Sequence, residues 1–288
     1  MKRAIVTGGS GFIGQYIIAE LLKKKFVVYN LDIINLDIKH KNYFFLKTDI
    51  INLEHCKLSF KNSYVFHCAA IAELSKANKD PIKTININTI ATLKIIKKCQ
   101  KENSKLIYIS SSYADSDKSL FYGLSKKMCE KSIYYFNEIK LFRFTIARYG
   151  SLYGQGAQKW NLIERIISDS TRNKETVYNG SINDEREYIN IIDAAEITVS
   201  LIDKKYDNKI FLISGNQRTS IRTICNIIEE NMNKKVKIKF LNKKNNLHYN
   251  YTPYNLNNKN LDIRKIIKDT SRDFNYEISN IISKKFQD

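Results

Sequence analysis

Proline is almost absent from the 288-residue sequence, which has only Pro81 and Pro253, and no glycine- or serine-rich stretch separates its two halves. A flexible linker between independent domains is therefore missing. No internal repeat is visible, so a repeat architecture is not indicated. The hydrophobic content of 43% is enough to bury a sizeable core over this length. We expect one large α/β domain that carries a smaller lobe.

Long hydrophobic runs are also missing. No apolar run reaches the roughly 18 residues that a membrane-spanning helix needs, and residues 1–7 enter a short strand-like run rather than a signal peptide. The sequence thus predicts a cytoplasmic protein with no membrane partner.

The five cysteines include no C-x-x-C pair, which is typical of reduced thiols. The four histidines, His248 among them, lack ligand spacing, so we expect no metal site and interpret them as ordinary surface or core residues.

Acidic residues are few against basic ones: 29 Asp and Glu stand against 48 Lys and Arg, for a formal net charge of +19. Clustered lysines would favour contacts with nucleic-acid phosphates. Here the lysines are spread in short runs at the ends of predicted helices, where a cation interacts favourably with the helix dipole. We interpret the charge as mainly compositional and expect no nucleic-acid partner, whereas an anionic small substrate would still be attracted.

The first half of the chain alternates β-rich apolar runs with amphipathic stretches, the pattern of parallel strands joined by crossover helices. Strands are predicted at 4–7, 26–32, 43–48, 63–68, 105–110 and 141–148, and helices at 12–24, 82–100 and 126–135. In the less regular second half we expect helices at 162–169, 194–202 and 221–232, strands at 187–191, 209–214 and 236–240, and a loop at 242–260.

The predicted fold class is α/β, with a Rossmann-type doubly wound parallel sheet and a smaller carboxy-terminal substrate lobe. We expect the sheet domain to cover residues 1–155, with 188–215 returning to it. The lobe is expected to consist of 156–187 and 216–288.

A glycine motif, Thr7-Gly8-Gly9-Ser10-Gly11-Phe12-Ile13-Gly14, follows the first predicted strand and opens the first predicted helix. Gly8 permits the tight turn, Gly11 lets backbone amides approach a pyrophosphate, and Gly14 lets the helix pack close to the strand. The helix amino terminus supplies partial positive charge to the phosphates. Because strand, turn and helix agree, the motif predicts a dinucleotide site.

Asp32 ends the second predicted strand, 18 residues after Gly14. A carboxylate there accepts hydrogen bonds from the adenosine ribose and repels a 2′-phosphate, which predicts NAD rather than NADP. Asp37 is the competing acid, but it lies beyond the strand end. Asp49, followed by Ile50, could lie under the adenine or be an ordinary turn residue.

Tyr122 and Lys126 lie four residues apart, so on a helix their side chains share one face. An ammonium beside a phenol lowers the pKa of the phenol, which lets it shuttle a proton to or from an alcohol oxygen. A Y-x-x-x-K pattern alone is common. After a glycine motif and a strand that ends in serine, it indicates NAD-dependent oxidation chemistry.

At this point the sequence resembles the extended short-chain dehydrogenase/reductase superfamily, in particular the NAD-dependent epimerase/dehydratase family that modifies nucleotide sugars. The resemblance runs over nearly the whole chain. The segments that carry it are 7–14, 48–50, 67–70, 88–92, 110–112, 122–126, 148–156 and 186–189.

The resemblance implies that Tyr122 is the general acid/base and Lys126 its pKa partner. The hydroxyl that orients the reacting oxygen would be Ser112, with Ser111 as the alternative. Cofactor contacts are implied for Gly8, Gly11, Phe12, Ile13, Gly14, Asp32, Asp49, Ile50, Ala69, Ala70, Tyr122 and Lys126. Substrate contacts are implied for Ser112, Asn88 and Arg186, the last on the substrate's diphosphate.

Three departures from the family pattern stand out. Ser112 and Tyr122 are only ten positions apart, and the Asp-Glu pair of the 4,6-dehydratases is replaced by Tyr113-Ala114. Without those proton-transfer groups, dehydration of the sugar is not expected. An arginine expected before residue 262 is also absent, with Lys259 or Arg264 as candidate replacements.

These features predict an NAD-dependent nucleotide-sugar epimerase that acts at C4 through a transient 4-keto sugar. The alternative is a nucleotide-4-keto-sugar reductase, which would deliver a single hydride with the same residues. A noncatalytic NAD-binding regulator is a third hypothesis, because a fold does not fix a function. The resemblance also implies a homodimer paired through the helices at 82–100 and 126–135.

Overall fold

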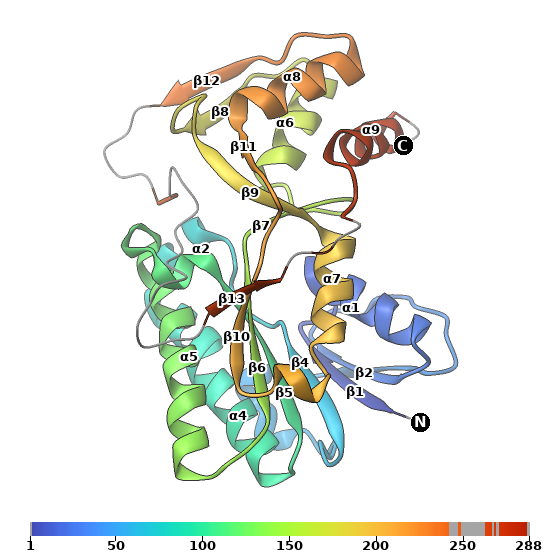
Figure 1. Ribbon diagram of the computed structural model, residues 1–288, viewed down its shortest axis with the longest axis vertical. Coiled ribbons are helices and arrows are strands. Elements are labelled where there is room, and N and C mark those ends of the chain that lie inside the picture. The colour runs from blue at the N-terminus through green and yellow to red at the C-terminus, as the bar shows by residue number, and fades with distance from the viewer. Residues whose placement is uncertain (1, 242–246, 249–262, 267, 269–270, 287–288) are drawn as a thin grey trace.

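The computed structural model describes residues 2–241, 247–248, 263–266, 268 and 271–286. Its larger part, in the lower half of Figure 1, is built around an eight-stranded sheet of order β13-β10-β6-β5-β4-β1-β2-β3. The strands are β1 (Arg3–Thr7), β2 (Val27–Asp32), β3 (Tyr43–Lys47), β4 (Ser63–His67), β5 (Lys105–Ser111), β6 (Phe144–Tyr149), β10 (Lys209–Ile213) and β13 (Ile263–Ile266). Every pair in this sheet is parallel, which confirms the predicted fold class.

The strand order reverses between β1 and β4, the position at which doubly wound sheets bind their ligands. Thr7 at the end of β1 is in register with Leu31 of β2 and with His67 of β4. The carboxyl ends of these three strands therefore lie together at one edge of the sheet, and the glycine motif follows directly from β1.

Two layers of helices cover the sheet (Figure 1). Helices α1 (Phe12–Lys23) and α7 (Ile191–Ser200) contact each other on one face, and α4 (Ala91–Lys101) and α5 (Leu120–Ile139) contact each other on the other. Buried aliphatic side chains such as Ile17 of α1 and Ile95 of α4 pack against the sheet. Each fully buried aliphatic side chain contributes about 1.5–3 kcal/mol, so both layers are firmly held.

The predicted helix at 82–100 is divided in the structure. It comprises α3 (Pro81–Thr84), the π-helical segment η2 (Ile85–Ile90) and α4, after a separate short helix α2 (Leu74–Lys79). Pro81 at the first turn fixes the start of α3, since proline has no amide hydrogen to donate. π-helical turns are rare and often occur at functional sites.

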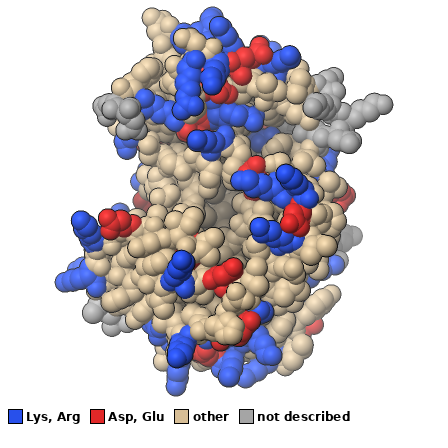
Figure 2. Space-filling model, turned by 180° about the vertical axis from the view of Figure 1, so that it is seen from behind, with Lys and Arg blue, Asp and Glu red and all other residues tan. Residues whose placement is uncertain are grey.

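The upper part of the molecule has its own core. It is formed by α6 (Leu162–Thr171), β8 (Thr176–Asn179), α8 (Ile221–Met232), β12 (Ile238–Leu241) and α9 (Phe274–Lys285). A three-stranded sheet of β11 (Arg218–Ser220), β9 (Glu185–Asn190) and β7 (Ser151–Tyr153) joins it to the lower part. Figure 2 shows that the surface is hollowed between the two parts, with Lys and Arg spread over both.

The predicted boundaries differ from the structure at β13. Residues 216–288 were expected in the lobe, but Ile263 of β13 is in register with Ile210 of β10, so 263–266 lie at the edge of the main sheet. The division of the rest of the chain into two domains stays a prediction. The expected loop at 242–260 lies, apart from 247–248, outside the described residues.

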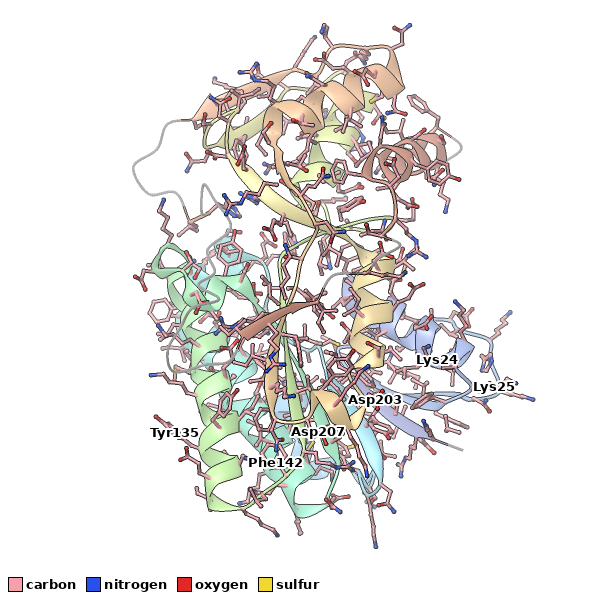
Figure 3. The ribbon with its side chains drawn as sticks, viewed as in Figure 1. Lys24, Lys25, Tyr135, Phe142, Asp203 and Asp207 are labelled. Atoms are coloured by element: carbon pink, nitrogen blue, oxygen red, sulfur yellow. The ribbon has the colours of Figure 1, made fainter. Side chains whose placement is uncertain are left out.

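Short helical turns complete the described chain: η1 (Ile50–His55), η3 (Ser112–Asp115), η4 (Asp117–Ser119) and η5 (Lys204–Tyr206). At the amino-terminal end of β5, the buried Lys105 Nζ donates to the carbonyl oxygens of Leu201 (2.6 Å) and Asp203 (3.0 Å) and pairs with Asp207. Asp203 and Asp207 are labelled in Figure 3. No helix of the described residues is long and apolar enough to cross a membrane.

Candidate functional site

A cavity of about 380 Å³ lies between the carboxyl ends of the strands and the upper part of the molecule. Its floor comes from the start of α1, the segment after β4, the end of β5 and the first turns of α5. Its roof comes from α6, β8 and β9. The cavity thus draws together segments that lie far apart in the sequence, at the edge of the sheet where the strand order reverses.

Tyr122 and Lys126 both line this cavity from α5, as their spacing predicts. The two residues are 8% and 4% exposed. Lys126 Nζ donates a 2.8 Å hydrogen bond to the carbonyl oxygen of Ile109, and burial lowers the pKa of this lysine. The ammonium is therefore held in place by β5 while it faces the cavity.

The same face of α5 is anchored one turn further on by a buried ion network. Glu130 accepts hydrogen bonds from Arg148 Nε (2.8 Å) and Nη2 (2.6 Å) and from Ser110 Oγ (2.5 Å). Arg148 Nη1 also donates to Asp115 (2.5 Å) in the short loop before α5. Because Tyr122, Lys126 and Glu130 are spaced four residues apart, this network fixes the rotation of the helix that carries the first two.

The structure leaves the choice between the two candidate serines open. Ser111 ends β5, lines the cavity and accepts a hydrogen bond from the Tyr113 amide (3.2 Å). Ser112 begins η3 and is 1% exposed. Both lie near the start of the short loop to α5, and the role of either stays a prediction.

The glycine motif forms a tight cradle between β1 and α1. Gly8 has φ 68°, and a Cβ on it would lie 2.5 Å from the Ala69 amide nitrogen. A Cβ on Gly14 would lie 2.3 Å from the carbonyl oxygen of Gly8. The N-cap of α1 is Gly11, which makes no side-chain cap hydrogen bond, so the first amides of α1 are left to a ligand.

Asp32 lies beside this cradle at the end of β2. Its carboxylate accepts hydrogen bonds from the amides of Ser10 (2.9 Å) and Ile34 (3.1 Å). Asp37 is exposed. The Asp49 carboxylate caps η1 by accepting a hydrogen bond from the Ile51 amide (3.0 Å). This bond supports the interpretation of Asp49 as an ordinary turn residue.

Asn88 does not fit its expected contact with substrate. It is 1% exposed, and its amide oxygen accepts from the Ile71 amide (2.7 Å) while its amide nitrogen donates to the Ile71 carbonyl (3.1 Å) and to Ser125 Oγ (3.1 Å). The side chain is thus occupied by the segment after β4 and by α5. Asn88 lies in the π-helical segment η2. From there its amide group links the segment after β4 to α5.

Arg186 of β9 lines the roof of the cavity, where it was expected to contact a substrate. Its Nη2 donates to the Tyr178 hydroxyl (3.2 Å), and burial raises the pKa of Tyr178 to about 12. Arg264, one of the two candidate replacements for a further arginine, lies on β13 and is exposed. Lys259, the other, lies outside the described residues.

Several cavity residues had no signal in the sequence. Tyr113 packs edge-on against Tyr122, with ring centroids 5.9 Å apart, and its hydroxyl lies 2.7 Å from His248 Nδ1. Burial, together with the charges of Arg186 and Arg165, lowers the pKa of His248 to about 3, so this ring is neutral. His248 lies in an aperiodic stretch and Arg165 on an ordinary amphipathic helix, so neither pattern indicated a site.

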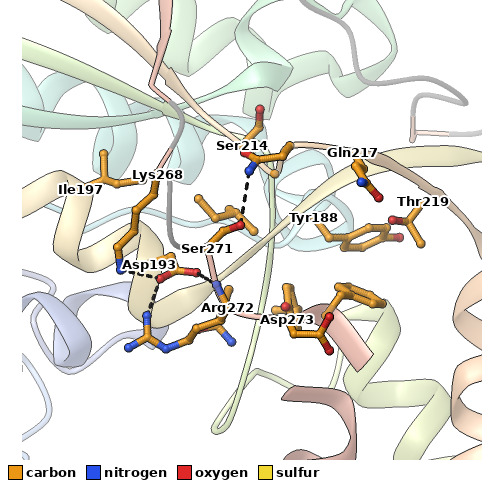
Figure 4. A pocket seen from close by; sticks show the side chains of 16 residues that line it. Tyr188, Asp193, Ile197, Ser214, Gln217, Thr219, Lys268, Ser271, Arg272 and Asp273 are labelled. Atoms are coloured by element: carbon orange, nitrogen blue, oxygen red, sulfur yellow. Dashed lines mark hydrogen bonds and ion pairs between the residues drawn. The ribbon is translucent and has the colours of Figure 1, made fainter. Parts of the chain in front are cut away.

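A second pocket of about 310 Å³ lies between α7, the end of β10, Lys268 and residues 271–274 (Figure 4). The Asp193 carboxylate in this pocket is paired with Lys268 Nζ (3.0 Å) and with the Arg272 guanidinium, and it also accepts a hydrogen bond from the Arg272 amide (2.8 Å). None of the predicted site residues lines it. The described residues contain no group of His, Cys, Asp and Glu that could hold a metal ion.

The family model described as the NAD dependent epimerase/dehydratase family matches residues 4–214. This segment holds the cradle, the Tyr122–Lys126 pair and Arg186, and it spans more than half of the chain. The chain belongs to this family. Its cofactor is accordingly NAD, as Asp32 and the glycine motif predict.

The proteins that are similar to this chain in sequence catalyse different reactions. A putative UDP-glucose 4-epimerase of Methanocaldococcus jannaschii is 26% identical over 250 residues, which cover 78% of this chain and 81% of the relative. A UDP-N-acetyl-alpha-D-glucosaminuronate decarboxylase of Bacillus cytotoxicus is 26% identical over 258 residues, which cover 80% of each. Family membership therefore leaves the reaction to be argued from the site.

Among solved structures, the UDP-glucuronic acid 4-epimerase of Bacillus cereus superposes with a TM-score of 0.85 at 21% identity. The superposition covers 98% of this chain and 99% of that one. It supports the fold of the described residues, those of the smaller upper part included.

The residues of this family member fit NAD. The close approach of Gly8 to the backbone of Ala69 leaves no room for a side chain where the turn must meet the pyrophosphate. The uncapped first turn of α1 offers amides to the phosphates, and the Asp32 carboxylate lies beside the Ser10 amide at the same turn. Tyr122 and Lys126 line the same cavity as Phe12 and Ile13, which stand at the start of α1.

Proposed function

We propose that the protein is an NAD-dependent epimerase that inverts C4 of a nucleotide hexose through a transient 4-keto sugar. The observation that carries this proposal is that one cavity is lined both by Tyr122 and Lys126 and by Arg186. The proposal places the sugar at the first pair and the diphosphate at the arginine. The named 4-epimerases among its relatives support this choice.

In the proposed reaction the phenolate oxygen of Tyr122 would accept the proton of the substrate's C4 hydroxyl as the C4 hydride departs, and the resulting hydroxyl would return the proton in the reverse step. Lys126 favours the phenolate form of Tyr122 by its positive charge, which burial in the cavity makes more effective. The hydroxyl of Ser112 or Ser111 orients the reacting oxygen. NAD, when bound, supplies the acceptor and later the donor of the hydride. The 4-keto sugar must present its opposite face before the return step.

The composition of the cavity weighs against elimination reactions. Removal of water from a sugar needs separate acid and base groups, usually carboxylates, beside the ring. The described cavity lining contains Lys126, Arg165 and Arg186 but no Asp or Glu. Tyr113 and Ala114 follow the serines instead of an acidic pair. The site is therefore equipped for moving a hydride and one proton.

The proposal also includes a homodimer paired through α4 and α5. Large apolar side chains on α5 are exposed: Leu120 by 53%, Leu124 by 47% and Met128 by 39%. Pairing of this helix with its copy would cover them. The molar mass in solution tests this part of the proposal, with Leu124→Glu expected to shift a dimer toward monomer.

The function is tested by incubating the NAD-loaded protein with UDP-, GDP-, CDP- and dTDP-hexoses and analysing the products by NMR. The proposal predicts the C4 epimer of at least one substrate with no net change in nicotinamide absorbance. Consumption of NADH in proportion to product, seen only with 4-keto sugars, would instead identify a reductase. A panel that yields no epimer would contradict the proposal.

A further inference from the structure

The residue that follows the two candidate serines, Tyr113, is held in place by the short loop before α5. Its amide donates to Ser111 Oγ (3.2 Å), and its carbonyl oxygen accepts from Ser119 Oγ (3.1 Å). A Cβ on Gly123 of α5 would overlap this carbonyl oxygen, so the loop can pack this closely only against a glycine. The backbone of Tyr113 is therefore fixed against the first turns of the helix that carries Tyr122.

The side chain of Tyr113 packs against the ring of Tyr122. The ring centroids lie 5.9 Å apart at an interplanar angle of 71°, an edge-to-face geometry that aromatic pairs favour. Leu74 and Ala77 of α2, both buried, belong to the same apolar cluster. The Tyr122 ring thus contacts side chains of α2 and η3 as well as its own helix, and this packing limits the orientations that its hydroxyl can take.

A hydrogen bond in turn orients the ring of Tyr113. Its hydroxyl lies 2.7 Å from Nδ1 of His248, and the two rings meet edge to face with centroids 6.2 Å apart. Because burial and the nearby arginine charges keep His248 neutral, its Nδ1 can accept the hydrogen of the Tyr113 hydroxyl. The contacts therefore run from His248 through Tyr113 to the ring of Tyr122.

We propose that Tyr113, oriented by His248, is a positioning residue that holds the phenol of Tyr122 in the orientation that proton transfer needs. The inference rests on the proposed function, since the proton transfer by Tyr122 is what requires this orientation. All three residues line the same cavity, whose described lining contains no Asp or Glu. An aromatic ring at position 113 thus supplies geometry to the site without adding a carboxylate.

The inference is tested with a nucleotide hexose that the NAD-loaded protein epimerises, by measuring kcat and KM separately. Tyr113→Phe keeps the ring and loses the bond to His248, whereas Tyr113→Leu loses the ring as well. Tyr276→Leu is the control, because Tyr276 is 65% exposed on α9 and does not line the cavity. The NAD affinity and the urea-unfolding curve of each variant show whether its fold is kept.

A positioning role predicts a loss in kcat with little change in KM, because a displaced phenol impairs the chemical step rather than substrate binding. The value of kcat should fall about tenfold in Tyr113→Leu and about threefold in Tyr113→Phe, and Tyr276→Leu should match the wild type.

Variants of His248 test whether the hydrogen bond orients Tyr113. His248→Leu should lower kcat as much as Tyr113→Phe does, and the double variant should be no slower than either single variant, because both changes remove the same bond. His248→Gln still offers an acceptor and should lie closer to the wild type than His248→Leu does. Fully additive losses in the double variant would show that the bond does not act through Tyr113.

A second readout follows the ring of Tyr122 directly and needs no turnover. In protein that carries isotope-labelled tyrosine, the NMR signals of this ring are identified by their absence in Tyr122→Phe. Tyr113→Phe and His248→Leu should both shift or broaden these signals, because the neighbouring ring loses its orientation, whereas Tyr276→Leu should leave them unchanged.

Three outcomes would overturn the inference, and they differ in what else they remove. If the wild type epimerises a substrate and both Tyr113 variants keep its kcat, Tyr113 does not position Tyr122, while the proposed function stands. A raised KM at unchanged kcat would make Tyr113 a substrate contact instead. If no nucleotide hexose is epimerised, the proposed function fails, and ring signals that are unchanged in Tyr113→Phe and His248→Leu would overturn the inference with it.

Discussion

The two ends of the cavity hold their charges in different ways. At the Tyr122 end, Arg148 is bonded to Glu130 and Asp115, and Lys126 is bonded to the Ile109 carbonyl. At the other end, Arg165 leaves its buried Nε without a hydrogen bond to a described residue. Polar groups that bond to each other hold a fixed geometry, which favours chemistry, whereas a buried donor without a bond carries a desolvation cost. Under the proposed function, we expect substitutions at the Tyr122 end to lower turnover or to loosen the elements that hold this pair.

The largest effect is expected for Tyr122→Phe, which tests the role of the Tyr122 end in turnover. Loss of the proton-transfer group should lower turnover by about 10²–10⁴-fold, with NAD and nucleotide affinity retained. Tyr135→Phe on the same helix, where Tyr135 is 58% exposed, is the control and should keep full activity. Steady-state rates and nucleotide titrations of both variants measure the effect. A Tyr122→Phe variant that turns over normally would remove Tyr122 from the chemistry.

The network beneath the Tyr122 end is tested by Glu130→Gln. Glu130 and Arg148 are 3% and 1% exposed, so removing one charge leaves the other buried with only Asp115 as its partner. We expect the free energy of unfolding to fall by about 3 kcal/mol. Glu138→Gln, an exposed site on the same helix, should change it by less than about 0.5 kcal/mol. Equal urea-unfolding curves for the two variants would show that the network does not stabilise α5.

Acid should lower the free energy of unfolding through His67, which is buried in the sheet at the end of β4. This ring bonds to Thr7 Oγ1 (2.6 Å) and Thr92 Oγ1 (2.8 Å), and burial, with the charge of Lys126, lowers the pKa of His67 to about 3. The unfolded chain binds a proton near pH 6.5 and the folded chain does not. Stability from His67 is therefore complete above pH 6.5 and is lost as the pH falls toward 3.

Between pH 7 and pH 5 this linkage amounts to about 2 kcal/mol. Urea unfolding at both pH values should show that His67→Gln loses less stability than the wild type by this amount. His55→Gln, at an exposed position, should follow the wild type. A wild-type pH dependence that survives intact in His67→Gln would contradict the buried, neutral state of this ring.

The smallest expected effect concerns the cofactor. Asp32→Ala should change the ratio of NAD to NADP affinity by about tenfold in favour of NADP, because it removes the carboxylate that is predicted to bond the ribose and to repel a 2′-phosphate. Asp37→Ala is the control, since Asp37 is exposed and was the competing acid. Fluorescence titration with both dinucleotides measures the ratio. A wild type that binds NADP as tightly as NAD would show that Asp32 does not contact the ribose.

The sequence predicted the amino-terminal half well because its signals are local. The cradle, Asp32 and the Tyr122–Lys126 pair each depend on residues close together in the chain, and strand and helix periodicity place them. The upper part was harder to predict. Strands such as β7 and β11 span only three residues, which is too short for a periodic pattern.

The cavity roof shows the same limit for the site. Arg165 belongs to an amphipathic helix whose sequence does not reveal what its polar side faces, and His248 reaches the cavity from a stretch without periodicity. Asn88 was expected to contact substrate, but the depth at which η2 is buried turns its amide toward Ile71 and Ser125. Such roles depend on packing between distant segments, which a single sequence does not display.

The most direct test of the account follows the C4 hydrogen itself. A nucleotide hexose that the protein epimerises is prepared with deuterium at C4 and incubated with the NAD-loaded wild type, and the product is examined by NMR and mass spectrometry. Removal and return of one hydride within a single cavity predicts an epimer that keeps its deuterium at C4, with the cofactor oxidised at the end of the cycle. Deuterium lost to solvent, or an epimer inverted at another carbon, would contradict the proposed chemistry.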